Sequence, residues 1–209
     1  MDNRTKKVLV IASKNEKKSK EMKDILESLL GGDWEIKTLM DYPQYEEPEE
    51  ISDSYAENAR IKAETAMRET GEMCIADDAG LEIDALGGKP GVHSKRFAGE
   101  ETPFPEKIRQ ILEMLRDVPE EKRTARFRCF VAIASPGMET RIFEASKEGK
   151  IAFEPRGSYG FGYDPIFYLP EYGKTYAEML PEEKNRISHR FLVLKKTAEW
   201  LNTSVSVES

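Results

Sequence analysis

Cysteine and histidine are scarce in this sequence of 209 residues, which contains two of each. Cys74 and Cys129 lie in apolar, strand-like runs, a setting typical of buried, reduced thiols rather than of a disulfide or a metal cluster. The histidines, His93 and His189, are too few to favour a zinc site. The sequence therefore argues against a disulfide framework and against zinc chemistry.

The N-terminal segment lacks a long hydrophobic run. The apolar stretch Val8–Ala12 follows a charged start and is too short for a signal peptide or a transmembrane helix. Lys and Arg total 32 against 39 Asp and Glu, and the formal net charge of -7 argues against sequence-independent binding to a nucleic-acid backbone. We expect a cytoplasmic protein that binds neither nucleic acid nor membrane, although local positive charge or a metal would still allow a polyanionic small ligand.

Apolar periodicity predicts a mixture of strands and helices. Hydrophobic runs and turn signals predict strands at Val8–Ala12, Trp34–Leu39, Met73–Ala76, Ala125–Ser135, Thr140–Ile151 and Ile166–Leu169. Amphipathic spacing and capping residues predict helices at about Asn15–Leu30, from Ser54 to about Glu69, at Phe104–Leu115, and from Pro181 to about Leu201. The expected fold class is α/β, with a mixed twisted sheet flanked by helices. We expect one domain over residues 1–202, with two lobes and a central cleft, and a flexible tail at 203–209.

Two adjacent carboxylates, Asp77 and Asp78, follow the apolar segment Met73–Ala76 and precede Gly80. This pattern predicts a strand that ends at the carboxylates and is followed by a glycine turn. Adjacent aspartates repel each other, but at a strand end such a pair can hold a hard cation such as Mg²⁺ and leave one carboxylate to orient a water. Aspartate also commonly marks a plain turn, and the pair alone favours that simpler interpretation.

The first strand leads into a polar segment, Ser13–Lys18. A strand-to-helix turn presents backbone N–H groups and the positive end of a helix dipole, which together favour phosphate. Ser13 and Asn15 can add hydrogen bonds, and Lys18 can add a positive charge. The segment is not a Walker loop, because the required glycines are missing. The alternative is a capping box between Ser13 and Glu16 on a solvated helix, and the two interpretations are compatible.

Further polar residues are placed to reach a ligand. Asn58 and Lys62 stand four apart and share a helix face, although a lone surface lysine is the more usual outcome. The acidic loop Asp41–Glu50 could supply a metal oxygen from one of its glutamates, which are Glu46, Glu47, Glu49 and Glu50.

A glycine-rich loop, Gly160–Pro165, carries aromatic rings beside residues that let the backbone approach a ligand closely. Phe161 or Tyr163 could stack on a flat base; the alternative is that both rings belong to the core. Lys184 and the run Ser188–Arg190 would bring potential donors near the start of the last helix, where crowded polar residues usually mean exposure. Together the motifs suit a nucleoside triphosphate.

From Val8 to about Leu194 the sequence resembles the inosine/xanthosine triphosphate pyrophosphatases, a family that clears deaminated purine nucleotides. The resemblance rests on six blocks in the family's order, which are Ser13-x-Asn15-x-x-Lys18, Glu57-Asn58-Ala59-x-x-Lys62-Ala63, Ala76-Asp77-Asp78-Ala79-Gly80-Leu81, Gly87-Gly88-x-Pro90-Gly91, Gly160-Phe161-Gly162-Tyr163-Asp164-Pro165 and Ser188-His189-Arg190. It implies an elongated two-lobed α/β fold with the active site in the cleft, a homodimer, and Mg²⁺-dependent cleavage between the α- and β-phosphates. The products would be a nucleoside monophosphate and pyrophosphate.

The resemblance also implies roles for individual residues. Asp78 would be the catalytic carboxylate and a metal contact, with Asp77 beside it and Lys62 steadying phosphate charge. Glu50, or its neighbour Glu49, would complete the metal shell. The implied substrate-binding residues are Ser13, Lys14, Asn15, Glu16, Lys17, Lys18, Ala79, Phe161, Gly162, Tyr163, Asp164, Lys184, His189 and Arg190.

Two positions depart from the family's usual pattern. Lys14 stands where many relatives have glycine, which bears on loop geometry, and Ala79 stands where many have serine, which removes a hydroxyl. Two other functions remain open at this point. One is a pyrophosphatase for other modified nucleotides, and the other is a non-catalytic sensor that binds a magnesium nucleotide.

Overall fold

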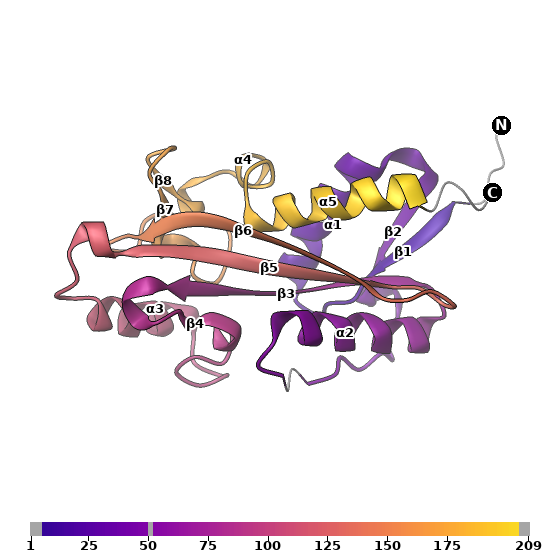
Figure 1. The fold of residues 1–209 in the computed structure, drawn as a ribbon, viewed down its shortest axis with the longest axis horizontal. Helices are drawn as coiled ribbons and strands as arrows, with labels where there is room; N and C mark the ends of the chain where they lie inside the picture. Colours follow the sequence, from indigo (N-terminus) through magenta and orange to yellow (C-terminus); the bar gives the residue numbers. More distant parts are fainter. Residues whose placement is uncertain (1–5, 50–51, 205–209) are drawn as a thin grey trace. The chain divides into compact units, whose positions relative to one another are not determined.

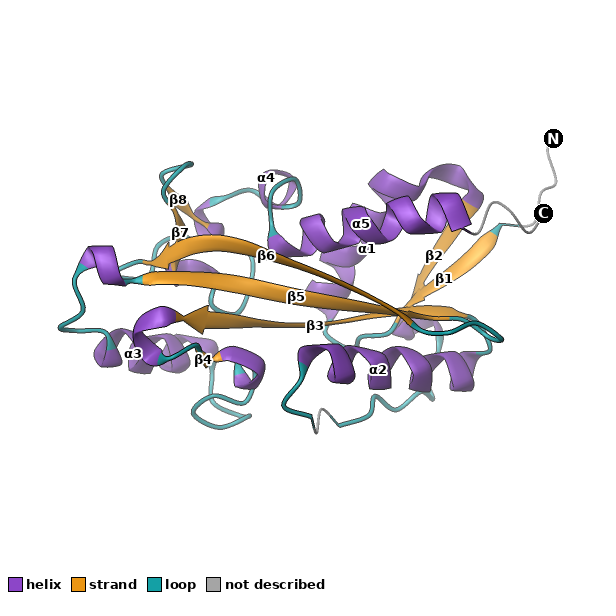
Figure 2. Ribbon diagram, viewed as in Figure 1, coloured by secondary structure: helices purple, strands orange, loops and turns teal. Residues whose placement is uncertain are grey.

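Strands and helices alternate along the first part of the chain, and a long strand pair follows (Figure 2). The structure, a computed structural model, describes residues 6–49 and 52–204. The strands are β1 (Lys7–Ile11), β2 (Trp34–Thr38), β3 (Met73–Ile83), β4 (Lys89–Pro90), β5 (Thr124–Ala134), β6 (Arg141–Ile151), β7 (Phe167–Leu169) and β8 (Lys174–Thr175). The α-helices are α1 (Glu16–Leu30), α2 (Tyr55–Thr70), α3 (Phe104–Met114), α4 (Pro181–Lys184) and α5 (His189–Ser204).

The described strands form one mixed sheet in the order β2-β1-β3-β5-β6-β7-β8, with β4 paired to β3. β1 runs parallel to both β2 and β3, and the register places Leu9 opposite Met73. β6, β7 and β8 are joined in antiparallel pairs. This arrangement confirms the predicted α/β class with a mixed sheet flanked by helices.

The chain divides into two compact units. Unit 1 comprises Met1–Asp78, Cys129–Ala145 and Arg190–Ser209, and unit 2 comprises Ala79–Arg128 and Ser146–His189. The strands β3, β5 and β6 each contribute residues to both units. The predicted cleft and the boundaries of a single domain at 1–202 stay predictions. The helix α5 continues to Ser204, and the rest of the predicted tail lies outside the described residues, so the tail also stays a prediction.

In unit 1, helices cover both faces of the sheet. α1 and α5 lie on one side of the strands and α2 on the other (Figure 1). The α2 face that meets the sheet is built from Ala59, Ala63 and Ala66, which are fully buried against residues of β1, β3 and β5. Because alanine has so small a side chain, α2 packs close to the sheet, and its polar residues Asn58 and Lys62 are carried inside with it.

Unit 2 has its own core, formed where α3 packs beside residues of β5, β7 and the segment before α4. Ile108 and Ile111 of α3 belong to one buried cluster with Phe167 and Tyr176. The guanidinium of the buried Arg123 donates to the carbonyls of Leu115, Val118, Ile151 and Ala152. Arg123 therefore joins the segment that follows α3 to the end of β6 through backbone carbonyls.

Two elements differ from the sequence prediction. β3 does not end at the aspartates: it runs unbroken to Ile83, so the predicted glycine turn after Asp78 is wrong. The expected last helix from Pro181 is two helices, because α4 ends at Lys184 and α5 begins at His189. Ile187 consequently lies outside α5 and packs against the unit 2 core.

Cys74 and Cys129 are both buried and reduced, as predicted. Over residues 6–49 and 52–204, no helix combines the length and the apolar character needed to cross a membrane.

Two glycines of unit 2 give a matched test of the packing. Gly157 and Gly173 both have positive φ, but a Cβ at Gly157 would lie 2.2 Å from the carbonyl of Ala177, whereas one at Gly173 would meet nothing within 4 Å. Left-handed backbone costs an alanine about 1–2 kcal/mol, and overpacking adds about 1–3 kcal/mol. We expect Gly157→Ala to lower the free energy of unfolding in urea by clearly more than Gly173→Ala. Equal losses of unfolding free energy in the two variants would contradict the close approach of the Ala177 backbone to Gly157.

Candidate active site

The turn between β1 and α1 is held by its own side chains. Asn15 caps α1, its Oδ1 accepting the N–H of Lys18 at 3.0 Å. Ser13 Oγ accepts the N–H of Asn15 at 3.2 Å, and Ser19 Oγ donates to the carbonyl of Ser13 at 2.9 Å. The cap is therefore Asn15, and the alternative of a capping box from Ser13 to Glu16 is wrong. Lys14, Asn15, Glu16 and Lys17 are exposed, so the turn presents an accessible polar surface.

One backbone amide of this turn already binds an anion. The N–H of Lys14 donates to Glu47 Oε2 at 3.1 Å, a contact between residues 33 positions apart. Glu47 comes from the acidic loop that precedes α2. A carboxylate on the amide at the start of a helix is the arrangement that the helix dipole favours, and a phosphate oxygen would be held in the same way.

The two adjacent aspartates face opposite sides of β3. Successive side chains of a strand alternate between the faces of its sheet. Asp77 contacts Arg190 of α5 and Lys18 of α1, whereas Asp78 accepts from Asn58 of α2. The unbroken strand therefore separates the two side chains, and metal binding at this position stays a prediction.

Asp77 is the centre of a buried cluster of charges. Its Oδ2 accepts Nε and Nη2 of Arg190 at 3.2 and 3.0 Å, and its Oδ1 lies 3.2 Å from Nζ of Lys18. The remaining arm of Arg190, Nη1, donates to Glu21 Oε1 at 2.9 Å. Oδ1 receives no hydrogen bond from the described residues, so the charge of Lys18 is its compensation. Asp77 is 1% exposed and Arg190 3% exposed, so this cluster is shielded from solvent.

Electrostatics keeps this cluster ionised. Burial alone raises the pKa of Asp77, but the positive charges of Lys18, Arg190 and Lys62 outweigh it and hold the pKa well below its usual range. Burial lowers the pKa of Arg190, and the carboxylates of Asp77 and Glu21 more than restore it. Burial also raises the pKa of the Cys129 thiol, whose sulfur lies 3.8 Å from Asp77 Oδ2 as a weak donor.

Asp78 lies on the α2 side of the strand with an amide as its partner. Asn58 Nδ2 donates to Asp78 Oδ2 at 3.0 Å and to the carbonyl of Ser52 at 3.0 Å, while its Oδ1 accepts the N–H of Ser52 at 3.0 Å. Lys62, one helical turn after Asn58, is 3% exposed. The alternative of a solvated surface lysine is therefore wrong. Asn58 ties Asp78 to the end of the acidic loop.

The fit of a magnesium ion depends on Asp78. Within 6–49 and 52–204, no three His, Cys, Asp or Glu side chains are gathered as a ligand set. Mg²⁺ is commonly held by one or two carboxylates together with substrate phosphates and water, so a single carboxylate fits it. Asp77 does not fit, because its charge is already neutralised by Lys18 and Arg190. Glu50, the predicted second ligand, lies outside the described residues.

Unit 2 holds a second set of predicted residues around one carboxylate oxygen. Oδ2 of Asp164 accepts Nζ of Lys184 at 2.7 Å and the N–H of Phe161 at 3.1 Å. The ammonium of Lys184 lies 4.9 Å from the ring centroid of Phe161. A Cβ at Gly160 would lie 2.1 Å from the same Asp164 oxygen, so this loop conformation needs glycine there. Lys184 and Asp164 form a buried ion pair, whereas the crowding of polar residues around Lys184 had suggested exposure.

The two aromatic residues of the glycine loop have different positions. Tyr163 is 3% exposed, and its hydroxyl donates to the carbonyl of Ser94 at 2.6 Å. Its ring packs edge-on against Phe104 at 5.1 Å between centroids, which makes it a core residue, and burial raises its pKa. The core interpretation is therefore correct for the Tyr163 side chain. Phe161, which is half-buried, remains the candidate for stacking on a base, next to Gly162.

The remaining predicted residues are also located. His189 is buried in unit 2, where its ring stacks on Phe127 at 4.6 Å between centroids and its Nδ1 lies 3.4 Å from the hydroxyl of Tyr176. Ala79 is half-buried within β3.

Sequence reasoning missed the contacts of three residues that hold the predicted ones in place: it did not single out Glu21 or Tyr176, and it considered Glu47 only as a candidate metal ligand. Glu21 pairs with Arg190, Tyr176 contacts His189, and Glu47 occupies the Lys14 amide. Glu21 stands three positions after Lys18 and directly before the buried Met22, and this placement of a charge on the inner face of α1 was a usable signal. The other two contacts join residues from separate loops, and no local spacing reports them.

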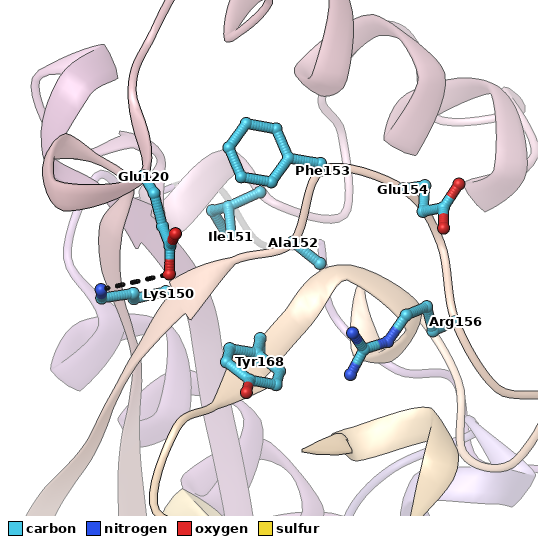
Figure 3. A pocket seen from close by; sticks show the side chains of 8 residues that line it. All are labelled: Glu120, Lys150, Ile151, Ala152, Phe153, Glu154, Arg156 and Tyr168. Carbon is cyan, nitrogen blue, oxygen red and sulfur yellow. Dashed lines mark ion pairs between the residues drawn. The ribbon is translucent and has the colours of Figure 1, made fainter. Parts of the chain in front are cut away.

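A hollow of about 330 Å³ on unit 2 is not part of this set (Figure 3). Phe153 and Tyr168 are among its walls, and its cations Lys150 and Arg156 are paired with Glu120 and Glu178 respectively. None of the described residues predicted for the site lines it.

Several known proteins are similar to this chain over most of its length. The sequence model of the Ham1 family matches residues 9–200. A dITP/XTP pyrophosphatase of Geobacillus kaustophilus is 50% identical over 193 residues, covering 92% of this chain and 93% of that protein. One of Halalkalibacterium halodurans is 46% identical over 194 residues, covering 92% and 98%. The solved structure of a HAM1 protein from Coxiella burnetii has a TM-score of 0.82 at 39% identity and covers 94% of this chain and 98% of that one.

The buried cluster predicts a pH-dependent stability. Asp77→Asn leaves Arg190 without its main partner, and breaking a buried pair costs about 3–5 kcal/mol. Because the pKa of Asp77 is lowered in the fold, its contribution is complete above an ordinary aspartate pKa of about 4 and is lost as the pH falls through the folded value. Urea denaturation should show a large difference between wild type and variant at pH 7 that shrinks below about pH 4.

The matched control is Asp84→Asn. Asp84 pairs with Arg126 at 3.0 Å on the surface of unit 2, where such pairs contribute about 0–1 kcal/mol. Equal destabilisation by the two variants at pH 7 would contradict the distinction between a buried and an exposed pair.

Proposed function

The chain belongs to the Ham1 family, and from that premise we propose that it hydrolyses the deaminated purine nucleoside triphosphates ITP, dITP and XTP to the monophosphate and pyrophosphate. Such an enzyme keeps these nucleotides out of DNA and RNA. The observation that carries the proposal is the position of Asp78, which is 5% exposed, bonded to Asn58, and separated by the strand pleat from the neutralised Asp77.

The chemistry needs a positioned nucleophile and neutralised phosphate charge. We assign to Asp78 the role of accepting the proton of the attacking water, with Asn58 fixing one of its oxygens. Mg²⁺ bound at Asp78 would supply charge neutralisation at the phosphates. Lys62 adds positive charge on the α2 side, and its burial strengthens that charge's effect because solvent screens it less.

We assign the triphosphate to the turn Ser13–Lys18. The helix dipole favours a polyanion at this turn, and the Lys14 N–H already donates to a carboxylate oxygen of Glu47. Substrate phosphate would displace that carboxylate. Lys18 carries the positive charge of the turn, and Asp77 holds its ammonium in a fixed place.

We assign the base to unit 2 residues. Phe161 offers a ring beside Gly162, and stacking on a base is worth about 1–3 kcal/mol. Lys184 and His189 supply donors, while Asp164 and Tyr163 hold the loop. Hypoxanthine and xanthine carry a 6-oxo acceptor where adenine has an amino donor, so N–H donors at this point disfavour adenine. Guanine also carries a 6-oxo group, so an enzyme that rejects guanine must do so through its 2-amino group.

We further propose that the enzyme works as a cytoplasmic homodimer whose partner molecule is a second copy and whose ligand is a small nucleotide rather than a nucleic acid. The net charge of -7 supports the last point, because a nucleic-acid backbone would be repelled.

Product analysis tests the proposal. The purified protein is mixed with Mg²⁺ and, separately, with ITP, XTP, ATP and GTP. Monophosphate and pyrophosphate from ITP and XTP, with ATP and GTP largely spared, are expected. Equal attack on all four would contradict the selectivity, and binding without products would favour a nucleotide sensor.

Asp78→Asn should lower kcat by about 10²–10⁴, because the general base is lost. Its free energy of unfolding should stay close to wild type, since the amide keeps the hydrogen bond from Asn58. Asp84→Asn serves as the control with unchanged kcat. Wild-type turnover in Asp78→Asn would remove Asp78 from the mechanism.

Lys18→Ala should chiefly raise the KM for ITP, because a positive charge at the triphosphate is lost. Lys20→Ala is the matched control: Lys20 lies on the same helix and pairs with Asp24 in solvent. Steady-state kinetics in which both variants keep the wild-type KM would make Lys18 a residue of the buried cluster alone.

A further inference from the structure

The contact between Glu47 and the Lys14 amide lies within unit 1. Oε2 of Glu47 accepts the N–H of Lys14 at 3.1 Å, although the two residues stand 33 positions apart in the chain. The amide comes directly before Asn15, which caps α1. The carboxylate therefore lies at the positive end of the helix dipole, where a negative charge is favoured.

The acidic loop is anchored on both sides of Glu47. Before it, Tyr45 is 4% exposed and belongs to the same buried cluster as Ala12, which leads into the turn. After it, Asn58 accepts the N–H of Ser52 and donates to the Ser52 carbonyl, both at 3.0 Å. A carboxylate on a loop held at both ends stays close to the amide, because the tether gives it a high effective concentration there.

A carboxylate and a phosphate compete for such an amide, because both present anionic oxygens that accept a charge-assisted hydrogen bond from a backbone N–H. An incoming phosphate oxygen has to displace Glu47 from the Lys14 N–H. A ligand that binds only the open form has its apparent affinity reduced by the fraction of molecules in that form. If the contact is formed in about nine molecules of ten, the affinity falls about tenfold.

We propose that Glu47 is an internal competitor, a carboxylate that occupies the Lys14 amide until a polyphosphate displaces it. The inference rests on the proposed function, in which the turn Ser13–Lys18 binds the triphosphate. Every anion that needs this amide loses the same factor in affinity. Single phosphates, which bind through few contacts, are thereby kept out, whereas a triphosphate retains affinity through its further contacts. The same competition weakens the binding of the product pyrophosphate.

Nitrogen–proton NMR of the metal-free protein without ligand tests the contact itself. An amide proton that binds a carboxylate resonates downfield of a solvated one, so Glu47→Ala should move the Lys14 signal upfield. Glu46→Ala is the matched control, because it removes the same charge from the exposed neighbouring residue, and it should leave the signal nearly in place. Glu47→Asp keeps the charge but shortens the side chain by one methylene, and it should also move the signal upfield. An unmoved Lys14 signal in Glu47→Ala overturns the proposal.

Calorimetric titration with inorganic tripolyphosphate tests the competition. The buffer contains no divalent metal, because a glutamate of the acidic loop is also a candidate metal ligand. Glu47→Ala should bind tripolyphosphate about five- to tenfold more tightly than the wild type, and Glu46→Ala within about twofold of it. Unchanged or weaker binding by Glu47→Ala overturns the proposal. Equal gains in the two variants also overturn it, because they would assign the effect to the charge of the loop rather than to the contact.

The proposal and the proposed function fail separately. If the wild type hydrolyses ITP and Glu47→Ala binds tripolyphosphate as the wild type does, the internal competitor is overturned and the proposed function stands. If the wild type hydrolyses no triphosphate but Glu47→Ala binds tripolyphosphate more tightly, the hydrolase is overturned and the competition at the Lys14 amide stands.

Discussion

The unbroken pairing of β3 through Asp77 and Asp78 is the constraint on which the site depends. Because β3 stays extended, the pleat sends one carboxylate toward α1 and α5 and the other toward α2. A turn at this point would have placed two negative charges side by side. The strand instead gives each aspartate its own surroundings, with charged partners for Asp77 and the amide of Asn58 beside Asp78.

The surroundings of Asp77 and Asp78 support the different roles that we propose for the two residues. Asp77 is compensated by Arg190 and Lys18, and Glu21 balances the remaining arm of Arg190, so the cluster combines two cations with two carboxylates. A buried cluster of this kind adds little to stability compared with an apolar core, but removal of one member leaves a charge uncompensated. We infer that its value is geometric, because it holds the Lys18 ammonium beside the turn that we propose binds the triphosphate. Asp78 accepts a hydrogen bond from the neutral amide of Asn58 on the other face of the strand.

The sequence alone was sufficient for the α/β class and for the approximate bounds of most elements. Periodicity and capping residues located α1, α2 and α3 because each buries one apolar face. The sequence was insufficient where contacts between distant segments override the local structural preference of a residue. Aspartate and glycine favour turns, yet β3 continues because neighbouring strands pair with it. Lys184 and His189 were expected to be exposed, because polar residues crowd the segment before α5. Both are buried, and Asp164 and Tyr176 contact them and reduce the free-energy cost of burying their polar groups. Those partners come from other segments, so no local pattern could reveal them.

Metal binding is the most direct test of the different roles proposed for Asp77 and Asp78. Electron paramagnetic resonance can follow Mn²⁺, in place of Mg²⁺, bound to the protein with a non-hydrolysable α,β-methylene analogue of ITP. The account predicts that Asp78→Asn weakens Mn²⁺ binding by about tenfold or more, a loss of at least about 1.4 kcal/mol. The folded fraction of Asp77→Asn should bind it nearly as the wild type does. Loss of binding in Asp77→Asn, with Asp78→Asn unaffected, would contradict the account.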